Sequence, residues 1–323
     1  MLLSGCEPAV LDPVGPVGQA DKTILIGSVV IMLCIIVPTI LAVLGFAWWF
    51  RAGNPRAQRL PHWAYSGQIE LVTWAIPLLT ITLLGGVTWV GSHELDPAKP
   101  LRSPNGVPAL EVQVVALDWK WLFIYPNQHV ASVNQLVIPA GRPVHFLMTS
   151  ASVMNAFFLP RLGSMIYVMN GMTSDLNLQA DQPGVFRGIS SHFSGDGFPG
   201  MHFEVRALDQ AGFDGWAAAT RATGSGLDAA RYAQLAIQTI NDPPSTFSTV
   251  EPGLFQKIVG QELAPGPGPV SQPHPVSSAG SAAASPRGRF SATALRGRFS
   301  ESALLRGQAA VCRATPQTYA KDQ

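Results

Sequence analysis

Cysteine is scarce in this 323-residue chain, which contains only Cys6, Cys34 and Cys312. Their spacing matches neither a disulfide framework nor a zinc or haem attachment motif, in which cysteines recur at short intervals. Cys34 lies within a long apolar run, and Cys312 lies in a low-complexity tail. The sequence therefore gives no indication of a fold that is stabilised by disulfides.

Charged residues are also few, at 13% of the chain, and they nearly balance to a net charge of +1. No basic patch or nucleic-acid-binding motif is present, which argues against a nucleic-acid partner. Charges are absent from Thr23–Phe50 and again from Leu71–Ser92. Each run reaches the ~20 residues that span a bilayer. These runs predict transmembrane helices at residues 23–50 and 70–92.

The loop between the two predicted spans, residues 51–69, indicates their orientation. It carries Arg51, Arg56 and Arg59, and no acidic residue precedes Glu70. Because short loops rich in Lys and Arg remain in the cytoplasm, this loop is predicted to be cytoplasmic. The N-terminal segment, residues 1–22, and everything after the second span are then predicted to face the outside.

Residues 103–223 have the pattern of a β domain. Short apolar-rich runs such as LEVQVVAL are bounded by Pro, Gly and Asn, which favours a sandwich or Greek-key barrel. Asp209 and Asp228 are placed to cap two helices, the second within a predicted C-terminal helical segment, 224–260. The tail, residues 261–323, is of low complexity and contains a nine-residue repeat, RGRFSATAL followed by RGRFSESAL. It has too little apolar surface to fold by itself.

The glycine-rich stretch Pro183–Val205 reads PGVFRGISSHFSGDGFPGMHFEV and lacks cysteine. Its glycines and aromatic residues are typical of a cupredoxin metal loop. Copper centres of that kind need thiolate sulfur, because soft ligands hold and tune copper. Ser190 and Ser194 stand where the thiols would be, and a hydroxyl is a poor copper ligand at neutral pH. The loop is predicted to keep the shape of a copper site without its chemistry.

Three motifs carry a family resemblance: DWKWLFIYP (Asp118–Pro126), SVMNAFFLPRLGSMIYVMNGM (Ser152–Met172) and GISSHFSGDGFPGM (Gly188–Met201). The chain resembles subunit II of the haem–copper terminal oxidases, in particular that of the bacterial cytochrome o-type ubiquinol oxidases. The resemblance runs from about Leu3 to about Gln256. It implies a two-helix transmembrane hairpin followed by an all-β, cupredoxin-like periplasmic domain.

In the cytochrome c-oxidising branch of this family, the domain binds two coppers through two His, two Cys, a Met and a Glu carbonyl. The resemblance maps these ligands onto degenerate positions, of which only the methionine is retained: Asn155, Ser190, His192, Ser194, Phe198 and Met201. It implies that these residues bind no metal and that this chain has no cofactor of its own. Haem and copper are expected in the partner subunit I. Trp119 and Trp121 are then predicted to pack rather than to carry electrons.

Two further residues are candidates for function. Glu70 is a carboxylate at the cytoplasmic end of a predicted span. A charge there is costly unless it is hydrated or paired, and it is by default a candidate for function. The resemblance places it at the entrance of the proton-uptake path into subunit I; the alternative is an interfacial carboxylate with no transport role. Leu3–Cys6 (LSGC) resembles a lipobox, although only two residues precede it here. Cys6 is therefore predicted to carry lipid after processing of an upstream signal.

The sequence as a whole predicts a non-catalytic subunit II of a proton-pumping quinol oxidase in the bacterial inner membrane. Oxidase subunits I, III and IV and membrane lipid are the expected partners, and ubiquinol is expected to bind through subunit I. Eight acidic and six basic residues in 103–223 give too little charge to attract a basic cytochrome c. Two other interpretations stay open: a copper-binding electron-transfer subunit of a cytochrome c oxidase, and a stand-alone lipoprotein binding module.

Overall fold

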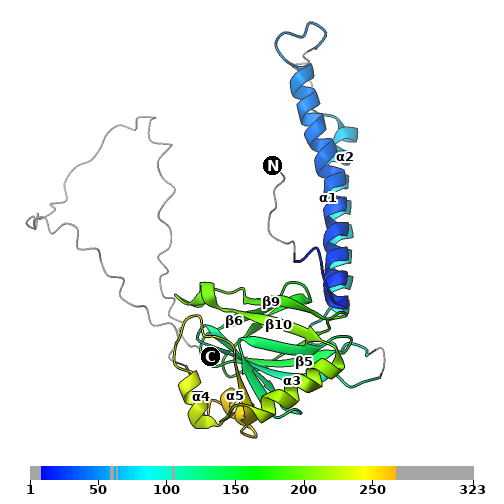
Figure 1. Ribbon diagram of the computed structural model, residues 1–323. Coiled ribbons are helices and arrows are strands. Elements are labelled where there is room, and N and C mark those ends of the chain that lie inside the picture. Colours follow the sequence, from blue (N-terminus) through cyan, green and yellow to red (C-terminus); the bar gives the residue numbers. More distant parts are fainter. Residues whose placement is uncertain (1–8, 59–61, 63–64, 104–105, 267–323) are drawn as a thin grey trace, which may run out of the picture. The chain divides into compact units, whose positions relative to one another are not determined.

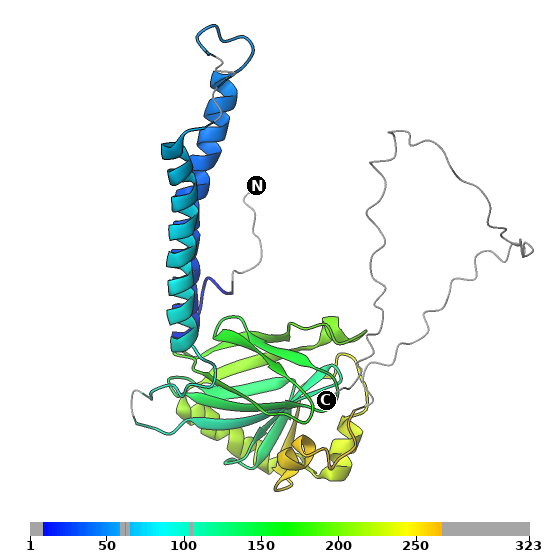
Figure 2. The same cartoon turned by 180° about the vertical axis from the view of Figure 1, so that it is seen from behind.

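The computed structural model describes residues 9–58, 62, 65–103 and 106–266. Its first two elements are long helices, α1 (Pro16–Trp49) and α2 (Gly67–Glu94), which lie side by side (Figures 1 and 2). Both are long and apolar enough to cross a membrane. α1 begins at Pro16 rather than at Thr23, because the fixed φ of proline suits the first turn of a helix. α2 likewise extends beyond the predicted 70–92.

Hydroxyl groups within these helices satisfy their hydrogen bonds internally. The side chains of Thr39, Thr80 and Thr82 each donate to the carbonyl oxygen four residues earlier, at 2.7, 2.7 and 2.9 Å. A hydrocarbon environment offers no water to polar groups, so such local bonds suit a spanning helix. The threonines of α1 and α2 are thus compatible with lipid around the helices.

The β domain consists of two facing sheets. One has seven strands in the order β11-β12-β3-β2-β1-β5-β8, and the other has five in the order β4-β10-β9-β6-β7. Most neighbours are antiparallel, but three pairs are parallel and therefore need crossover connections: β1 with β5, β4 with β10, and β11 with β12. The strands are β1 (Leu110–Leu117), β2 (Lys120–Tyr125), β3 (Val130–Val133), β4 (Gln135–Pro139), β5 (Val144–Ser150), β6 (Asn155–Leu159), β7 (Gly163–Val168), β8 (Ser174–Leu178), β9 (Gly184–Ser190), β10 (His202–Leu208), β11 (Ser225–Leu227) and β12 (Ser245–Val250).

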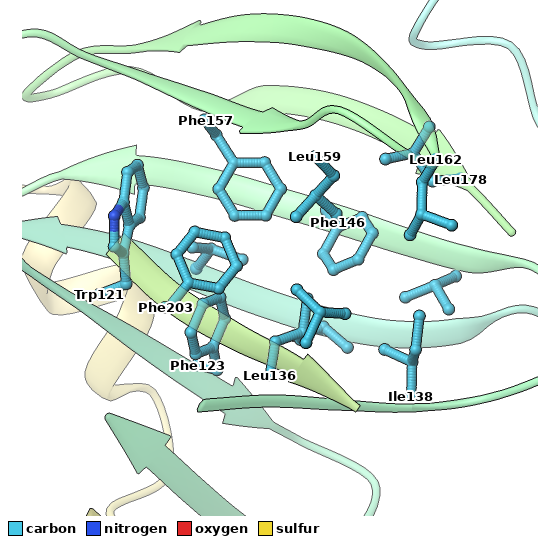
Figure 3. Packing of buried hydrophobic residues seen from close by; sticks show 14 of the residues in the cluster. Trp121, Phe123, Leu136, Ile138, Phe146, Phe157, Leu159, Leu162, Leu178 and Phe203 are labelled. Atoms are coloured by element: carbon cyan, nitrogen blue, oxygen red, sulfur yellow. The ribbon is translucent and has the colours of Figure 1, made fainter. Parts of the chain in front are cut away.

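Aromatic side chains fill the space between the two sheets. Trp121 and Phe123 from β2 meet Phe157 from β6 and Phe203 from β10 (Figure 3). The rings of Phe157 and Phe203 stack with centroids 5.3 Å apart, and Trp121 meets Phe157 edge-on at the same centroid distance. Such pairs add to the free energy gained by burying apolar area. The alternating pattern of the sequence therefore builds a sandwich around a ring cluster.

A second apolar cluster covers the other face of the seven-stranded sheet. Val115 and Leu117 of β1 and Leu122 and Ile124 of β2 point away from the ring cluster and pack beneath α4 (Ala229–Leu235) and α5 (Leu254–Val259). Because β1 and β2 are apolar on both faces, the C-terminal segment is needed to shield them. The β domain thus extends beyond residue 223.

The C-terminal segment differs from the helical segment predicted for 224–260. Its two strands, β11 and β12, extend the seven-stranded sheet, with β12 antiparallel to β3. Asp228 caps α4 as predicted, its side chain accepting from the Arg231 backbone N–H at 2.7 Å, but the helix ends at Leu235. Asp209 caps α3 (Gln210–Ala222) through the Gly212 N–H at 2.8 Å. A cap of this kind typically contributes about 1 kcal/mol.

Candidate functional site

The positions implied as former copper ligands gather at one end of the sandwich. Asn155 begins β6, Ser190 ends β9, and Ser194 and Met201 lie on the loop that joins β9 to β10. All four side chains are buried. Their elements are neighbours in one sheet, since β6 and β10 both pair with β9. Residues that are up to 46 positions apart in the sequence, from Asn155 to Met201, thus form one cluster.

Hydrogen bonds within this cluster join its members to one another. The Ser190 hydroxyl lies 3.4 Å from Asn155 Oδ1 and 3.4 Å from the His192 carbonyl oxygen. Asn155 Nδ2 donates to the Val153 carbonyl at 3.1 Å, and the Ser194 hydroxyl lies 3.8 Å from Met201 Sδ. The buried side-chain polar atoms of Asn155, Ser190 and Ser194 therefore have partners within the protein, as a stable interior requires.

Trp119 closes the cluster from the turn between β1 and β2. Its backbone is left-handed, with φ of 64°, an unusual conformation for a bulky residue. The indole Nε1–H donates to the Ser194 carbonyl at 3.0 Å, and the ring lies so close to Gly197 that a Cβ there would be 2.2 Å from it. Trp119 and the buried Trp121 therefore both pack into the domain, which agrees with the packing role predicted for them.

Two of the six positions lie at the margin of the cluster. His192 is half-buried, and its ring meets Tyr167 edge-on with centroids 5.9 Å apart. Phe198 is half-buried and packs edge-on against Phe193 at 5.6 Å. The imidazole of His192 thus packs against an aromatic ring. The other potential ligand groups in the cluster are hydroxyl, amide and thioether groups.

This donor set does not fit a copper centre. Hydroxyl and amide groups are weak ligands for copper, and no thiolate accompanies the single thioether of Met201. Within the described residues, no group of three or more His, Cys, Asp and Glu side chains is placed to hold a metal ion.

The sequence does not predict the ion pair that lies beside the cluster, between the buried Lys120 and the half-buried Asp242. Lys120 Nζ is buried and donates to Asp242 Oδ2 at 2.9 Å and to the Ile237 carbonyl at 3.0 Å. The hydroxyl of Thr239 also lies within hydrogen-bonding distance of Nζ. The same segment is held by Asn134, whose Nδ2 donates to the Asp242 carbonyl at 2.9 Å. In the sequence, the sign of this buried charge is the position of Lys120 between two tryptophans.

Known protein families match both the β domain and the segment that follows it. The periplasmic domain of cytochrome c oxidase subunit II, as a family model, matches residues 110–208, and the COX aromatic rich motif matches residues 221–266. Ubiquinol oxidase subunit 2 of Acetobacter aceti is 48% identical over 261 residues, which cover 81% of this chain and 85% of that protein. The chain belongs to the quinol oxidase subunit 2 family.

Other members of the quinol oxidase subunit 2 family agree. Cytochrome bo(3) ubiquinol oxidase subunit 2 of Pseudomonas aeruginosa is 44% identical over 259 residues, covering 80% of this chain and 78% of that protein. Among solved structures, the periplasmic domain of subunit II of cytochrome oxidase from Bradyrhizobium japonicum is 24% identical; the match covers 35% of this chain and 94% of that one, with a TM-score of 0.33. Membership of the family confirms the resemblance seen in the three motifs and the fold class predicted from it.

The structure separates Glu70 from the cluster. This residue lies exposed in the first turn of α2, whereas the chain enters the β domain after the other end of that helix. At 1.5 Å per residue, Glu70 and Glu94 are about 36 Å apart along the helix axis. Glu70 and the former ligand positions therefore do not form one site. Cys6 lies outside the described residues.

Proposed function

We propose that this chain is the non-catalytic subunit 2 of a membrane-bound ubiquinol oxidase, which oxidises ubiquinol and reduces O₂ to water. The observation that carries this proposal is the cluster of Asn155, Ser190, Ser194 and Met201, whose polar atoms bond to protein groups in place of copper. The chain then supports subunit I structurally and assembles with subunits III and IV. Subunit I holds haem and copper and binds ubiquinol. Cytochrome c is not a partner.

The two long helices support placement in the bacterial inner membrane. Arg51, in the loop between them, lies over the ring of Trp48 with 5.4 Å to the ring centroid, as expected of a cation beside an interfacial aromatic residue. We propose that this loop is cytoplasmic and that the N-terminus and the β domain are periplasmic. Glu70, at the start of α2, then faces the cytoplasmic side and contributes to the proton-uptake entrance of subunit I.

Lipidation of Cys6 is a separate part of the proposal, supported by the LSGC motif. Mass spectrometry of the chain extracted from membranes is expected to show a diacylglyceryl adduct on Cys6 as the mature N-terminal residue. Loss of the adduct in Cys6→Ser should leave the chain in the membrane, because two spanning helices hold it far more firmly than acyl chains do. An unmodified Cys6 thiol in mature wild-type protein would disprove the anchor.

Copper loading tests the proposed absence of a redox centre. The full chain, purified in detergent and exposed to excess Cu(II) or Cu(I), is expected to retain well under one copper per chain after desalting. It should show no thiolate-to-copper charge-transfer absorption. A matched variant, Ser190→Cys/Ser194→Cys, supplies the two missing thiolates and should retain more copper than wild type. Stoichiometric copper with strong absorption in the wild-type chain would refute the proposal and favour the electron-transfer interpretation.

A further inference from the structure

A small pocket of about 300 Å³ lies where the linker after α2 meets the β domain. Its walls come from Val17 of α1, from the linker around residues 94–102, and from Asn177 of β8. Asn177 holds the linker in place, because its Nδ2 donates to the carbonyl oxygens of Pro97 and Ala98 at 3.1 and 3.2 Å. The backbone N–H of Gly18 donates to the Leu162 carbonyl at 3.0 Å and fixes the start of α1. The pocket is therefore built from several anchored segments.

Charges of both signs line this pocket. Glu94 and Asp96 supply two carboxylates, and Lys99 and Arg102 supply two cations. In the part of the chain that the structure describes, none of the four forms an ion pair with another side chain. All four are exposed, and their charges sum to zero. Such a set suits a ligand that itself carries one positive and one negative group.

The position of the pocket on α2 indicates the kind of ligand, and this step rests on the membrane placement proposed above. Trp89 is exposed on α2 five residues before Glu94, about 7.5 Å along the helix axis. Exposed tryptophans of spanning helices sit at the membrane–water interface. A pocket that begins at Glu94 is then level with lipid headgroups. The buried side chain of Val17 and the half-buried Leu95 and Leu101 give it an apolar wall.

We propose that this pocket binds the headgroup of a zwitterionic phospholipid, phosphatidylethanolamine, from the outer leaflet. Lys99 and Arg102 bind the lipid phosphate, for which the guanidinium offers paired N–H donors. Glu94 and Asp96 accept hydrogen bonds from the lipid ammonium. Phosphatidylglycerol has the phosphate but no ammonium for the carboxylates, and phosphatidylcholine has a cation without N–H donors. The pocket should therefore prefer phosphatidylethanolamine to both.

Lipid competition with the intact complex tests this preference. The oxidase containing the full chain is reconstituted into nanodiscs of equal phosphatidylethanolamine and phosphatidylglycerol, and the lipids that remain bound after transfer to detergent are counted by native mass spectrometry. Lys99→Glu/Arg102→Glu should lower the retained phosphatidylethanolamine about fivefold. Glu94→Gln/Asp96→Asn should shift retention toward phosphatidylglycerol. The matched control Arg187→Glu/Arg221→Glu makes the same charge change at exposed positions outside the pocket and should behave as wild type.

The outcomes separate this proposal from the proposed membrane placement. Extraction of membranes at alkaline pH shows first whether the wild-type chain is integral. A chain released by this treatment would refute the placement and the pocket assignment together. An integral chain whose lipid preference is unchanged in both pocket variants would refute the pocket assignment alone. Loss of phosphatidylethanolamine equal to that of the control variant would also refute it.

Discussion

Replacement of Lys120 by methionine is expected to lower the free energy of unfolding of the β domain by about 2–3 kcal/mol. Methionine fills a similar volume but removes the buried ammonium group, which donates hydrogen bonds to Asp242 and to the Ile237 carbonyl. Asp242 stays 27% exposed, so water compensates part of the loss. Denaturant unfolding of the full chain in detergent, followed by tryptophan fluorescence, measures the difference.

A second lysine provides the control for this experiment. Lys257 pairs with Glu251 at 2.6 Å, but its side chain is 39% exposed. Water screens exposed pairs of this kind and leaves them little net effect on stability, so Lys257→Met should unfold close to wild type. An equal loss of unfolding free energy in the two variants would show that the Lys120–Asp242 pair does not anchor residues 237–242 to β2.

The effect of Lys120→Met should depend on pH through Asp242. Burial by itself would raise the pKa of this carboxyl, but hydrogen bonds from Thr239 and Lys120 and the charge of Lys120 outweigh it and hold the pKa below its ordinary value of 3.8. A carboxyl with a lowered pKa in the folded state stabilises the protein above its unfolded pKa, and this stabilisation is lost as pH falls through the folded value. The difference between wild type and Lys120→Met should therefore be full at pH 7 and shrink below pH 3.8.

Replacement of Glu70 by alanine is expected to reduce the turnover of the assembled oxidase several-fold, about three- to tenfold. In the proposed role, the carboxylate at the start of α2 collects protons at the membrane surface, so its removal should slow their delivery. Haem content and the KM for ubiquinol should stay unchanged, since both belong to subunit I in this account. Glu70→Asp keeps the charge on a shorter side chain and should retain more activity than Glu70→Ala.

Oxygen consumption across pH 6 to 9 measures this effect in fully assembled complex. Asp214→Asn, which removes an exposed carboxylate from α3, serves as the matched control and should leave turnover unchanged. Wild-type turnover in Glu70→Ala at every pH would reduce Glu70 to an interfacial carboxylate with no role in proton uptake.

Much of the fold follows from local sequence pattern. The uncharged runs predict α1 and α2 because length and apolar character suffice to define a spanning helix. Alternation in LEVQVVAL predicts β1, and Asp209 predicts the start of α3 because a cap acts within one turn. Only the exact ends of these elements differ, as at Pro16, where the helix extends outside the apolar run.

Features that depend on distant residues were not accessible in this way. β12 reads STFSTV, with only two apolar residues, and its place in the sheet is set by pairing with β3. The partner of Lys120 is 122 residues away, so the sequence shows a charge but not its counter-ion. The former ligand positions can be recognised in the sequence only through its resemblance to a family. Their burial under Trp119 depends on a left-handed turn that no local pattern revealed.

We propose that this chain serves a quinol oxidase and not a cytochrome c oxidase. The most direct measurement purifies the complex through a tag on this chain and compares oxygen consumption with ubiquinol and with reduced cytochrome c. A haem-containing partner should co-purify and ubiquinol should support turnover, whereas cytochrome c should give no rate above background. Cytochrome c oxidation at a rate comparable to that with ubiquinol, or isolation of the chain without haem from intact membranes, would contradict this proposal.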